Sequence, residues 1–486
     1  MTAIPQGVFK AFAAVRAWVA LAPARVLEVP RTNHRRSALS ASSTSQKLVS
    51  APVARLEGRV RAPGDKSISH RALMFGAVTV GETTIEGLLE GEDILSSAAA
   101  LRLLGATVDR TGEGAWRVRG VGVGGFREPP DVLDMGNSGT AARLLSGLIA
   151  SHAFTSFMTG DASMRRRPMM RVIEPLSRMG ARFVSREGGR LPMAVTGAPT
   201  MMPIEYRLPV ASAQVKSAIL LAGLNTPGET TVIEPEPTRD HTERMLEGFG
   251  ATVRTKALDD GARAITIVGQ PELAGNRHIV VPGDPSSAAF AVVAAAIRPG
   301  SDVLVENVGI NPTRAGLYET LREMGAALTF ENQRVMGGET VADIRIKGGA
   351  LKGIDVPAHR APSMIDEYPV LAVAAACAEG TTRMQGVAEL RAKESDRLAS
   401  VAAGLEANGV RFEIGTDYLH VQGCNGAPPG GGLVAAHLDH RIAMAFLVLG
   451  TAAKSAVAID DGTTINTSFP GFAVLMNGLG TKIANA

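Results

Sequence analysis

The apolar and polar positions of this chain follow one pattern that recurs six times. In each occurrence an amphipathic, helix-like run ends at a glycine and a strand-like run follows, as in LRLLGATV from Leu101 and LEGFGATV from Leu246. Glycine here is typical of the left-handed residue that ends a helix, so the pattern predicts a helix, a tight turn and a strand. The spacing of about 70 to 85 residues is longer than that of common solenoid repeats. The six glycines are Gly105, Gly180, Gly250, Gly325, Gly409 and Gly480.

A second pattern lies about 40 residues before each of these glycines. A polar turn opens a helix of small apolar residues there, as in PGDKSISHRALMFGA from Pro63 and GNSGTAARLLSGLIA from Gly136. Strand-like runs such as TTIEGLL and SDVLVENV separate the helices. Together the patterns predict a βαβα-type module repeated six times, and six matches in register indicate internal duplication.

The length of 486 residues exceeds what one ordinary hydrophobic core holds. Six modules divide naturally into three per lobe, with the break near VVPGDPSS around Pro282, which echoes RAPGDKSIS around Pro63. Two matching Pro-Gly turns predict two strands that cross between the lobes, so ARLEGRVRAP is expected to belong with the C-terminal half. We expect lobe one to comprise residues 51–63 and 283–486, lobe two to comprise residues 64–282, and the active site to lie between them.

Residues 1–50 differ in composition from the rest of the chain. They contain one acidic residue, Glu28, against seven basic residues, and they close with SALSASSTSQ. This composition predicts a disordered tail, a start codon placed too far upstream, or an organelle transit peptide. A secretory signal fits poorly, because Arg16 interrupts the apolar stretch.

Charge and composition argue against several classes of function. A net charge of +3 over 50 basic and 47 acidic residues does not favour a nucleic-acid partner. The apolar runs are far shorter than the ~20 residues of a membrane helix, so no membrane partner is expected. Cys377 and Cys424 are too few for a disulfide framework and are expected to be free thiols. No HExxH, GxSxG or complete P-loop occurs, and GVGVGG at Gly120 is not followed by a helix-like run.

The helix openings carry side chains suited to anions. The N-terminus of a helix has free N–H groups and a positive partial charge, so it binds phosphate or carboxylate. The first opening supplies Lys66, Ser67 and Arg71, which at this spacing can flank one ligand. In the second opening, Gly139 allows close backbone approach.

Two further polar segments lie between the openings: GDASMRRRPM, with Arg167, and RAKESDR, where Lys393 and Arg397 would share one face of a helix. Each segment alone also fits a solvated turn or a helix start, and His437 and His440 have no third ligand for a metal. Recurrence favours function, because duplication would point equivalent openings of the two lobes into one cleft.

Seven motifs in order carry a resemblance to a known family: PGDKSISHRA, GNSGTAAR, RRRPM, SAQVKSA, MIDEYP, KESDR and DHRIAM. Over about residues 53–479 the chain resembles the 5-enolpyruvylshikimate-3-phosphate (EPSP) synthases. The resemblance implies an α/β fold, the two-lobed enolpyruvyl transferase fold or inside-out α/β barrel, with three βαβαββ units per lobe. It implies transfer of the enolpyruvyl group of phosphoenolpyruvate to the 5-hydroxyl of shikimate 3-phosphate, with loss of phosphate through a tetrahedral intermediate. This reaction serves chorismate and aromatic amino acid biosynthesis.

The same resemblance implies roles for particular residues. Asp366 would accept the 5-hydroxyl proton, Glu394 would move a proton at the methylene carbon, and Lys66 would lie between the two ligands. The residues implied for shikimate 3-phosphate are Lys66, Ser67, Arg71, Ser212, Gln214, Arg239, Asp366 and Lys393. Those implied for phosphoenolpyruvate are Lys66, Gly139, Arg167, Gln214, Arg397 and Arg441. No metal and no cofactor are implied.

The implied carboxylates lie among cations, which should give them a low pKa and make them weak bases. Exclusion of water on lobe closure and the negative charge of the substrates should partly offset this effect. The motifs GDKS, SAQVK, RDHTE and NPTR resemble the class II, herbicide-tolerant members of the family. Gly139 nevertheless leaves room for the inhibitor glyphosate, and Thr467 stands where many members place a lysine.

Two other functions fit part of this pattern. UDP-N-acetylglucosamine enolpyruvyl transferase shares the fold, but would have Lys-Asn in place of Lys66-Ser67 and usually a loop cysteine. A non-catalytic anion-binding scaffold would be favoured by loss of Asp366 or Glu394, and both are present. We expect a cytoplasmic monomer that acts on small molecules, or a plastid enzyme if the N-terminal segment is a transit peptide.

Overall fold

The computed structural model describes residues 46–486. The extension predicted over residues 1–50, with its transit-peptide alternative, therefore lies almost wholly outside the described part. Its predicted end is wrong, because strand β1 (Leu48–Ala51) already belongs to the fold. This strand pairs antiparallel with β23 (Val457–Ile459) and β24 (Lys482–Asn485), and its alternate residues are buried. An alternating apolar face of only four residues, directly after a polar run, was too short a signal to predict a strand.

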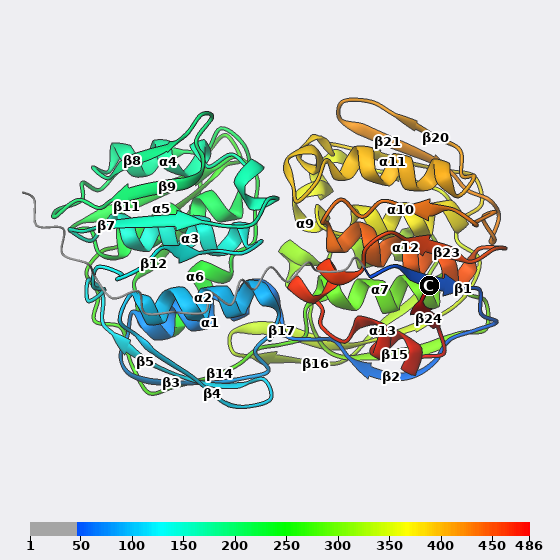
Figure 1. Ribbon diagram of the computed structural model, residues 1–486, viewed down its shortest axis with the longest axis horizontal. Helices are drawn as coiled ribbons and strands as arrows, with labels where there is room; N and C mark the ends of the chain where they lie inside the picture. Colours follow the sequence, from blue (N-terminus) through cyan, green and yellow to red (C-terminus); the bar gives the residue numbers. More distant parts are fainter. Residues whose placement is uncertain (1–45) are drawn as a thin grey trace, which may run out of the picture. The chain divides into compact units, whose positions relative to one another are not determined.

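Six four-stranded sheets share one topology, in which a parallel pair of strands is followed by two antiparallel partners. Three sheets are built from strands between residues 80 and 280 (Figure 1): β14 (Arg277–Val280), β3 (Val80–Glu86), β5 (Ala115–Val121) and β4 (Thr107–Gly112); β6 (Leu133–Asp134), β7 (Thr155–Thr159), β9 (Arg190–Thr196) and β8 (Arg182–Arg186); β10 (Glu205–Arg207), β11 (Glu229–Glu234), β13 (Arg263–Val268) and β12 (Val253–Ala257).

The other three sheets combine later strands with the first two strands of the described residues, which Figure 1 draws in blue among green to red elements. They are β2 (Glu57–Arg61), β15 (Asp302–Gly309), β17 (Glu339–Lys347) and β16 (Ala327–Met336); β18 (Asp355–Val356), β19 (Thr381–Gln385), β21 (Tyr418–Gln422) and β20 (Phe412–Ile414); and β22 (Leu433–Val434), β23, β1 and β24.

Each module has one inner helix, which is largely buried, and a second helix, which is partly exposed. The inner helices are α1 (Lys66–Ala77), α3 (Gly139–Ala150), α5 (Ala213–Leu224), α7 (Pro285–Ala296), α10 (Tyr368–Cys377) and α12 (His440–Ala452). The second helices are α2 (Glu92–Leu103), α4 (Met170–Arg178), α6 (His241–Gly248), α8 (Gly316–Glu323), α11 (Arg397–Ala407) and α13 (Phe472–Gly478). All six predicted helix-ending glycines adopt a positive φ, between 69° and 116°, which confirms that prediction.

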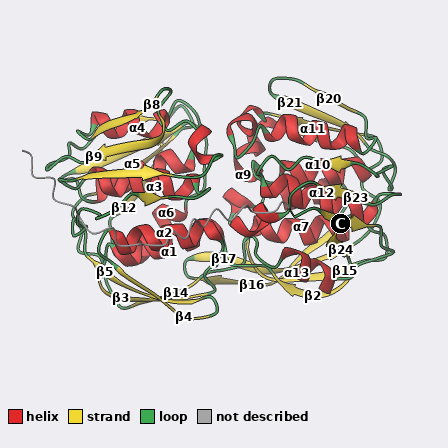
Figure 2. Cartoon of the chain, viewed as in Figure 1, coloured by secondary structure: helices red, strands yellow, loops and turns green. Residues whose placement is uncertain are grey.

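Two separate hydrophobic cores organise these modules. One extends from Ile68 to Val281, and we call the part around it lobe two. The other combines Leu48 to Ala62 with Ala288 to Ile483, and we call the part around it lobe one. Small side chains allow the inner helices of each lobe to pack closely, and Figure 2 shows helices gathered inside the sheets. The predicted α/β fold of six βαβαββ modules is confirmed.

The chain passes between the lobes twice, at the two matching Pro-Gly-Asp segments. The amide of Asp65 donates to the carbonyl of Pro282 at 2.7 Å, and the amide of Asp284 donates to the carbonyl of Pro63 at 2.8 Å. Strand β2, before the first segment, pairs with β15, and strand β14, before the second, pairs with β3.

Two smaller observations concern the sequence predictions. Both cysteines are free thiols, as predicted. Within residues 46–486 no helix is long and apolar enough to cross a membrane.

Candidate active site

The N-terminal ends of all six inner helices, or the turns just before them, contribute to one cavity of about 420 Å³. The contributing residues include Lys66, Gly139, Ala213, Asp284, Asp366 and His440. The prediction that equivalent helix openings face one cleft is therefore confirmed. Because each helix start carries a positive partial charge, the arrangement creates a site for anions before any side chain is considered.

Side-chain caps fix five of these six helix starts. The capping side chains accept hydrogen bonds from backbone amides of the first helical turn, and they belong to Asp65, Ser138, Ser212, Asp284 and Asp439. Such caps hold the end of a helix in one position. The remaining inner helix, α10, instead follows the short helix α9 (Ala361–Met364), which leaves Asp366 in the turn between the two.

Eleven of the thirteen residues predicted for the site line this cavity. They are Lys66, Ser67, Gly139, Arg167, Ser212, Gln214, Arg239, Asp366, Lys393, Glu394 and Arg441. Arg71 and Arg397 do not line it.

Arg71 lies on the buried side of helix α1 and not beside Lys66 at its opening. Its guanidinium donates to the hydroxyls of Thr242 and Ser217 at 2.7 and 2.8 Å, and to the carbonyl of Ser67 at 3.0 Å. Five residues along a helix are more than one turn, so the two side chains leave at different heights along the axis. In this structure Arg71 supports the helix opening from behind, and its contact with a ligand stays a prediction.

Arg397 is fully buried directly behind the cavity. Its Nε donates to Oδ2 of Asp439 at 2.8 Å, its Nη1 donates to Oδ1 of Asp366 at 2.9 Å, and its Nη2 pairs with Glu394. Helix α11 begins only at Arg397, so Lys393 is extended and the two residues do not share a helical face as the sequence pattern suggested. One guanidinium thus orients both predicted catalytic carboxylates.

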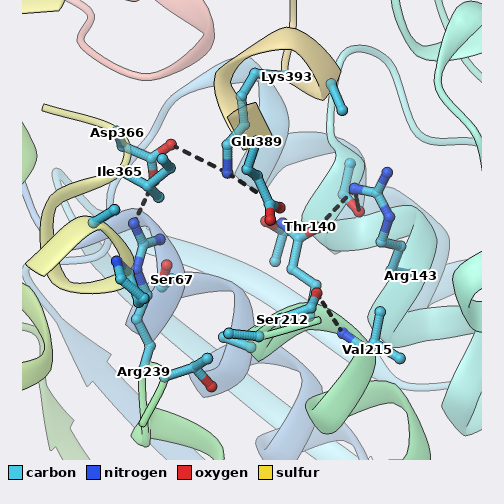
Figure 3. A pocket seen from close by; sticks show the side chains of 18 of the residues that line it. Ser67, Thr140, Arg143, Ser212, Val215, Arg239, Ile365, Asp366, Glu389 and Lys393 are labelled. Carbon is cyan, nitrogen blue, oxygen red and sulfur yellow. Dashed lines mark hydrogen bonds and ion pairs between the residues drawn. The ribbon is translucent and has the colours of Figure 1, made fainter. Parts of the chain in front are cut away.

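Asp366 accepts ion pairs from several directions, as Figure 3 shows for two of them. Arg239 from lobe two pairs with its Oδ2, and the Nζ of Lys393 lies 3.9 Å from its Oδ1. Burial opposes ionisation of Asp366, but the charges of Arg239, Lys393, Arg441 and Arg397 outweigh burial and hold the pKa of this carboxyl well below its ordinary value.

Glu394 connects the lobes at the other side of the cavity. Its Oε1 lies 3.7 Å from Nη1 of Arg167, and its backbone carbonyl accepts a hydrogen bond of 2.9 Å from Ser163, both in lobe two. Burial would raise its pKa, but Arg397 and Arg167 lower the pKa of Glu394 well below its ordinary value. Both pKa shifts have the direction expected for carboxylates among cations.

Gly139 stands where two guanidinium groups converge. A Cβ atom there would lie 2.8 Å from Nη1 of Arg143 and 3.0 Å from Nη1 of Arg167. Arg167 is itself held by Asn137, whose Oδ1 accepts a hydrogen bond of 2.8 Å from Nη2. The absence of a side chain at position 139 therefore leaves room for cations beside the start of helix α3.

Arg143 ends the predicted opening GNSGTAAR but was not predicted as a site residue; it lines the cavity and donates to Oε1 of Gln214 at 2.6 Å. Gln214 in turn donates to Thr140 at 2.9 Å, so the starts of helices α3 and α5 are joined. Burial lowers the pKa of Arg143 to about 10. A signal was available, because Arg143 follows Gly139 by four residues and so lies on the same helical face.

Lys66 also has a partner that the sequence did not reveal. Its Nζ pairs with Asp93 of helix α2, whose carboxyl pKa is raised by burial. Because Asp93 is almost fully buried, it fixes the ammonium group at the cavity wall.

One other group, Asp240, His241 and Glu339, brings three potential metal ligands within 4.8 Å of one another. Glu339 already accepts from His241 at 2.7 Å and from Asn311 at 3.0 Å, and Arg314 lies 3.5 Å from the other ring nitrogen of His241. A guanidinium at this distance favours a hydrogen-bonded cluster over a cation site.

The EPSP synthase (3-phosphoshikimate 1-carboxyvinyltransferase) family model matches residues 50–476, which is most of the chain. The chain belongs to the EPSP synthase family. A 3-phosphoshikimate 1-carboxyvinyltransferase of Paramagnetospirillum magneticum is 64% identical over 437 residues, which cover 90% of this chain and 98% of that relative. The protein of the same name from Rhodospirillum rubrum is 61% identical over 433 residues, which cover 88% of this chain and 96% of the relative.

Solved structures agree with this family. An EPSP synthase from Acinetobacter baumannii has a TM-score of 0.79 and 47% sequence identity, covering 91% of this chain and all of that one. The enolpyruvyl transferase NikO from Streptomyces tendae has a TM-score of 0.73 at 19% identity, covers 91% of this chain and 99% of that one, and shows the shared fold alone. The predicted resemblance is confirmed. Because these relatives come from bacteria, the plastid alternative gains no support from them.

Proposed function

We propose that this chain carries out the reaction of its family in the cavity described above. The 1-carboxyvinyl (enolpyruvyl) group of phosphoenolpyruvate is transferred to the 5-hydroxyl of shikimate 3-phosphate, and phosphate leaves. The observation that carries this proposal is the convergence of six helix starts, with cations from both lobes, around two carboxylates in one cavity of about 420 Å³. Two polyanionic substrates are the ligands for which such a field is suited.

The cations divide between the two ligands. In this proposal Ser67, Ser212 and Arg239 hold shikimate 3-phosphate, together with Gln214 and Lys393. Phosphoenolpyruvate lies beside Gly139, where Arg167 and Arg441 bind its carboxylate and phosphate. Arg397 orients Asp366 and Glu394 from behind the cavity, and its own contact with the ligand stays a prediction. Lys66, held at the wall by Asp93, contacts both ligands. Arginine forks suit carboxylate and phosphate because they present two parallel N–H groups.

The ion pairs of Asp366 and Glu394 suggest how these weak bases become competent. Arg239 pairs with Asp366 in the structure, so a substrate phosphate that binds Arg239 removes a counter-charge from Asp366. Its pKa then rises toward the range in which it accepts the 5-hydroxyl proton. Displacement of Arg167 from Glu394 by phosphoenolpyruvate acts in the same way on the second carboxylate.

Asp366 and Glu394 together account for the proton transfers of both chemical steps. Displacement of Arg167 raises the pKa of Glu394, which first takes up a proton from water. The 5-oxygen forms a bond to C2 of phosphoenolpyruvate as its proton passes to Asp366, and the electrons of the C2–C3 double bond take the proton of Glu394 onto C3. In the second step the bond from C2 to the phosphate oxygen breaks, C3 returns a proton to Glu394, and Asp366 gives its proton to the departing phosphate. Preplaced positive charge stabilises the tetrahedral intermediate, and no covalent nucleophile is required.

The test is a phosphate-release assay with purified protein. We expect phosphate only when phosphoenolpyruvate and shikimate 3-phosphate are both present. Release from phosphoenolpyruvate alone, or equal release with UDP-N-acetylglucosamine as the acceptor, would contradict the proposal. Glyphosate, which resembles phosphoenolpyruvate in charge, should inhibit the reaction competitively with it.

The setting of the reaction is also part of the proposal. We propose that the chain acts as a monomer in the cytoplasm, without nucleic-acid or membrane partners. Sedimentation velocity on the purified protein, with and without both substrates, should show one species of about the chain mass of 50.6 kDa.

A further inference from the structure

Two arginines occupy equivalent positions in the third and fourth modules. Arg239 and Arg314 both close a Pro-Thr-Arg sequence, and they precede the helix-ending glycines Gly250 and Gly325 by the same eleven residues. Each follows the end of a strand, β11 or β15, by five residues. Duplication therefore supplies the same backbone location twice, once in each lobe.

Their surroundings differ sharply. The side chain of Arg239 is 20% exposed and reaches Asp366 across the cavity. The side chain of Arg314 is only 3% exposed, although part of it lines the base of the cavity. It has turned away from the ligand space and toward the place where the chain crosses between the lobes.

At that crossing the guanidinium of Arg314 joins both lobes. Nη1 donates to Oδ2 of Asp65 at 3.0 Å, and Nη2 donates to Oδ1 of Asp284 at 3.1 Å. These two aspartates occupy matching places in the two Pro-Gly-Asp segments and cap α1 and α7, the first inner helix of each lobe. One planar cation therefore holds two helix caps that belong to different lobes.

Three contacts of Arg314 lead toward predicted catalytic residues. Asp65 directly precedes Lys66, and the amide of Lys66 lies 3.4 Å from Oδ2 of Asp284. Nη2 of Arg314 also donates to Ser286 at 2.8 Å, and Ser286 donates to Glu367, the neighbour of Asp366. The contacts of one side chain thus connect the backbone at Lys66 with the turn that contains Asp366.

We propose that Arg314 is a positioning residue, which sets Lys66 and Asp366 at the correct separation when the lobes close on substrate. The inference rests on the proposed function. A lysine could keep the charge but lacks the fork that reaches both aspartates. Loss of this alignment should lower turnover much more than it lowers substrate binding, because binding needs only the cavity cations and turnover needs the placed pair.

The experiment compares Arg314→Lys with a matched control, Arg345→Lys. Arg345 also makes a two-bond pair with an aspartate, Asp302, at 2.9 and 2.7 Å, but lies on strand β17 outside the cavity. For Arg314→Lys we expect kcat to fall by about tenfold to hundredfold. The Kd for shikimate 3-phosphate, measured by calorimetry without the second substrate, should change less than about threefold. Arg345→Lys should keep both values.

A second variant distinguishes a role of Arg314 in aligning the site from a role in stabilising the fold. Arg314→Gln leaves two buried aspartates without a cation and should lower Tm. Adding Asp284→Asn removes one of those charges while its amide oxygen can still cap helix α7, so Tm should recover but kcat should not. Recovery of kcat together with Tm would overturn the proposal. It would mean that Arg314 only neutralises the buried aspartates and does not position Lys66 and Asp366.

Three further results would overturn either the role of Arg314 or the proposed function. Normal kcat in Arg314→Lys would overturn the inference alone, provided that the unaltered chain releases phosphate with both substrates. Loss of shikimate 3-phosphate binding in Arg314→Lys would also overturn it and would make Arg314 a ligand contact. If the unaltered chain releases no phosphate, the proposed function itself fails, and this inference fails with it.

Discussion

The two lobes present different charges to the same cavity. Lobe two contributes five cations and two acids: Lys66, Arg143, Arg167, Arg171 and Arg239, with Asp93 and Glu236. Lobe one contributes four acids and three cations: Asp284, Asp366, Glu389 and Glu394, with Arg314, Lys393 and Arg441. Both proposed catalytic carboxylates are therefore in lobe one, whereas the excess of cations over acids is in lobe two.

The comparison shows that two duplicated lobes can keep the same backbone arrangement and differ in their charged side chains. Both lobes inherit the same inward-pointing helix starts, which attract anions in general. The side chains at these helix starts differ, because lobe two supplies most of the cations and lobe one supplies both carboxylates that are proposed to be catalytic. Three ion pairs join the surfaces across the cavity, and they connect Arg239 to Asp366, Arg167 to Glu394, and Arg171 to Glu389. Substrate anions must compete with these carboxylates for the guanidinium groups.

The largest effect should come from the catalytic side of the comparison. Asp366→Ala removes the proposed proton acceptor, so kcat should fall by about 10²- to 10⁴-fold while shikimate 3-phosphate still binds. Phosphate release and calorimetry measure the two quantities. Asp355→Ala is a matched control, because Asp355 pairs with Arg383 at 3.1 Å on the exposed surface of the same lobe. Near-normal turnover in Asp366→Ala would refute the role of this carboxylate.

A replacement on the binding side should act on the substrate and less on turnover. Arg239→Ala loses a charged hydrogen bond worth about 1.5–3 kcal/mol, so the KM for shikimate 3-phosphate should rise by about tenfold to hundredfold. Initial rates at varied shikimate 3-phosphate give this value. Arg254→Ala, which breaks an exposed pair with Glu229 in the same lobe, should leave KM unchanged. A pure loss of kcat in Arg239→Ala would break the division between the lobes.

Gly139→Ala should have a smaller effect on selectivity within lobe two. The added methyl would meet Arg143 and Arg167 at 3.0 Å or less, so both guanidiniums must shift and crowd the phosphoenolpyruvate position. We expect the inhibition constant for glyphosate to rise by about tenfold, more than the KM for phosphoenolpyruvate, because the inhibitor is longer. Gly248→Ala, where a Cβ meets nothing within 4 Å, is the control. An unchanged inhibition constant would show that the inhibitor does not approach position 139.

The smallest effect concerns stability in acid. The pKa values of Asp366 and Glu394 lie well below the ordinary 3.8 and 4.5, so near those values the unfolded chain binds more protons than the folded one. Their contribution to the free energy of unfolding is therefore complete above the ordinary values and is lost as the pH falls below them. The free energy of unfolding, measured with urea, should fall more steeply below about pH 4 for the unaltered chain than for the double variant Asp366→Asn with Glu394→Gln. Parallel curves would mean that the cations do not favour the ionised forms.

The sequence was informative wherever local rules decide the structure. The six glycines at helix ends could be predicted, because only a residue without a side chain adopts a positive φ at little cost. Their register predicted the repeated module, and the polar turns predicted the anion-binding helix starts. Strand β1 was missed because four residues carry too little pattern, and because it completes a module whose other strands lie at the far end of the chain.

The site was predictable in its residue types but not in its internal connections. Arg71 and Arg397 were recognised as important cations, yet the structure turns both into the protein, where they orient neighbouring groups. Asp93 as the partner of Lys66 could not be predicted, because no rule of sequence spacing relates positions on two different helices.

By itself the sequence determined the modules, the helix starts and the list of charged side chains, because each depends on backbone preferences or periodicity over a few residues. Only the tertiary structure decided which charges meet. Arg239 and Arg314 have the same sequence context, but one faces the cavity and the other holds two helix caps. The reason is physical: an electrostatic pair depends on distance and burial, and both are set by packing between segments that lie far apart in the chain.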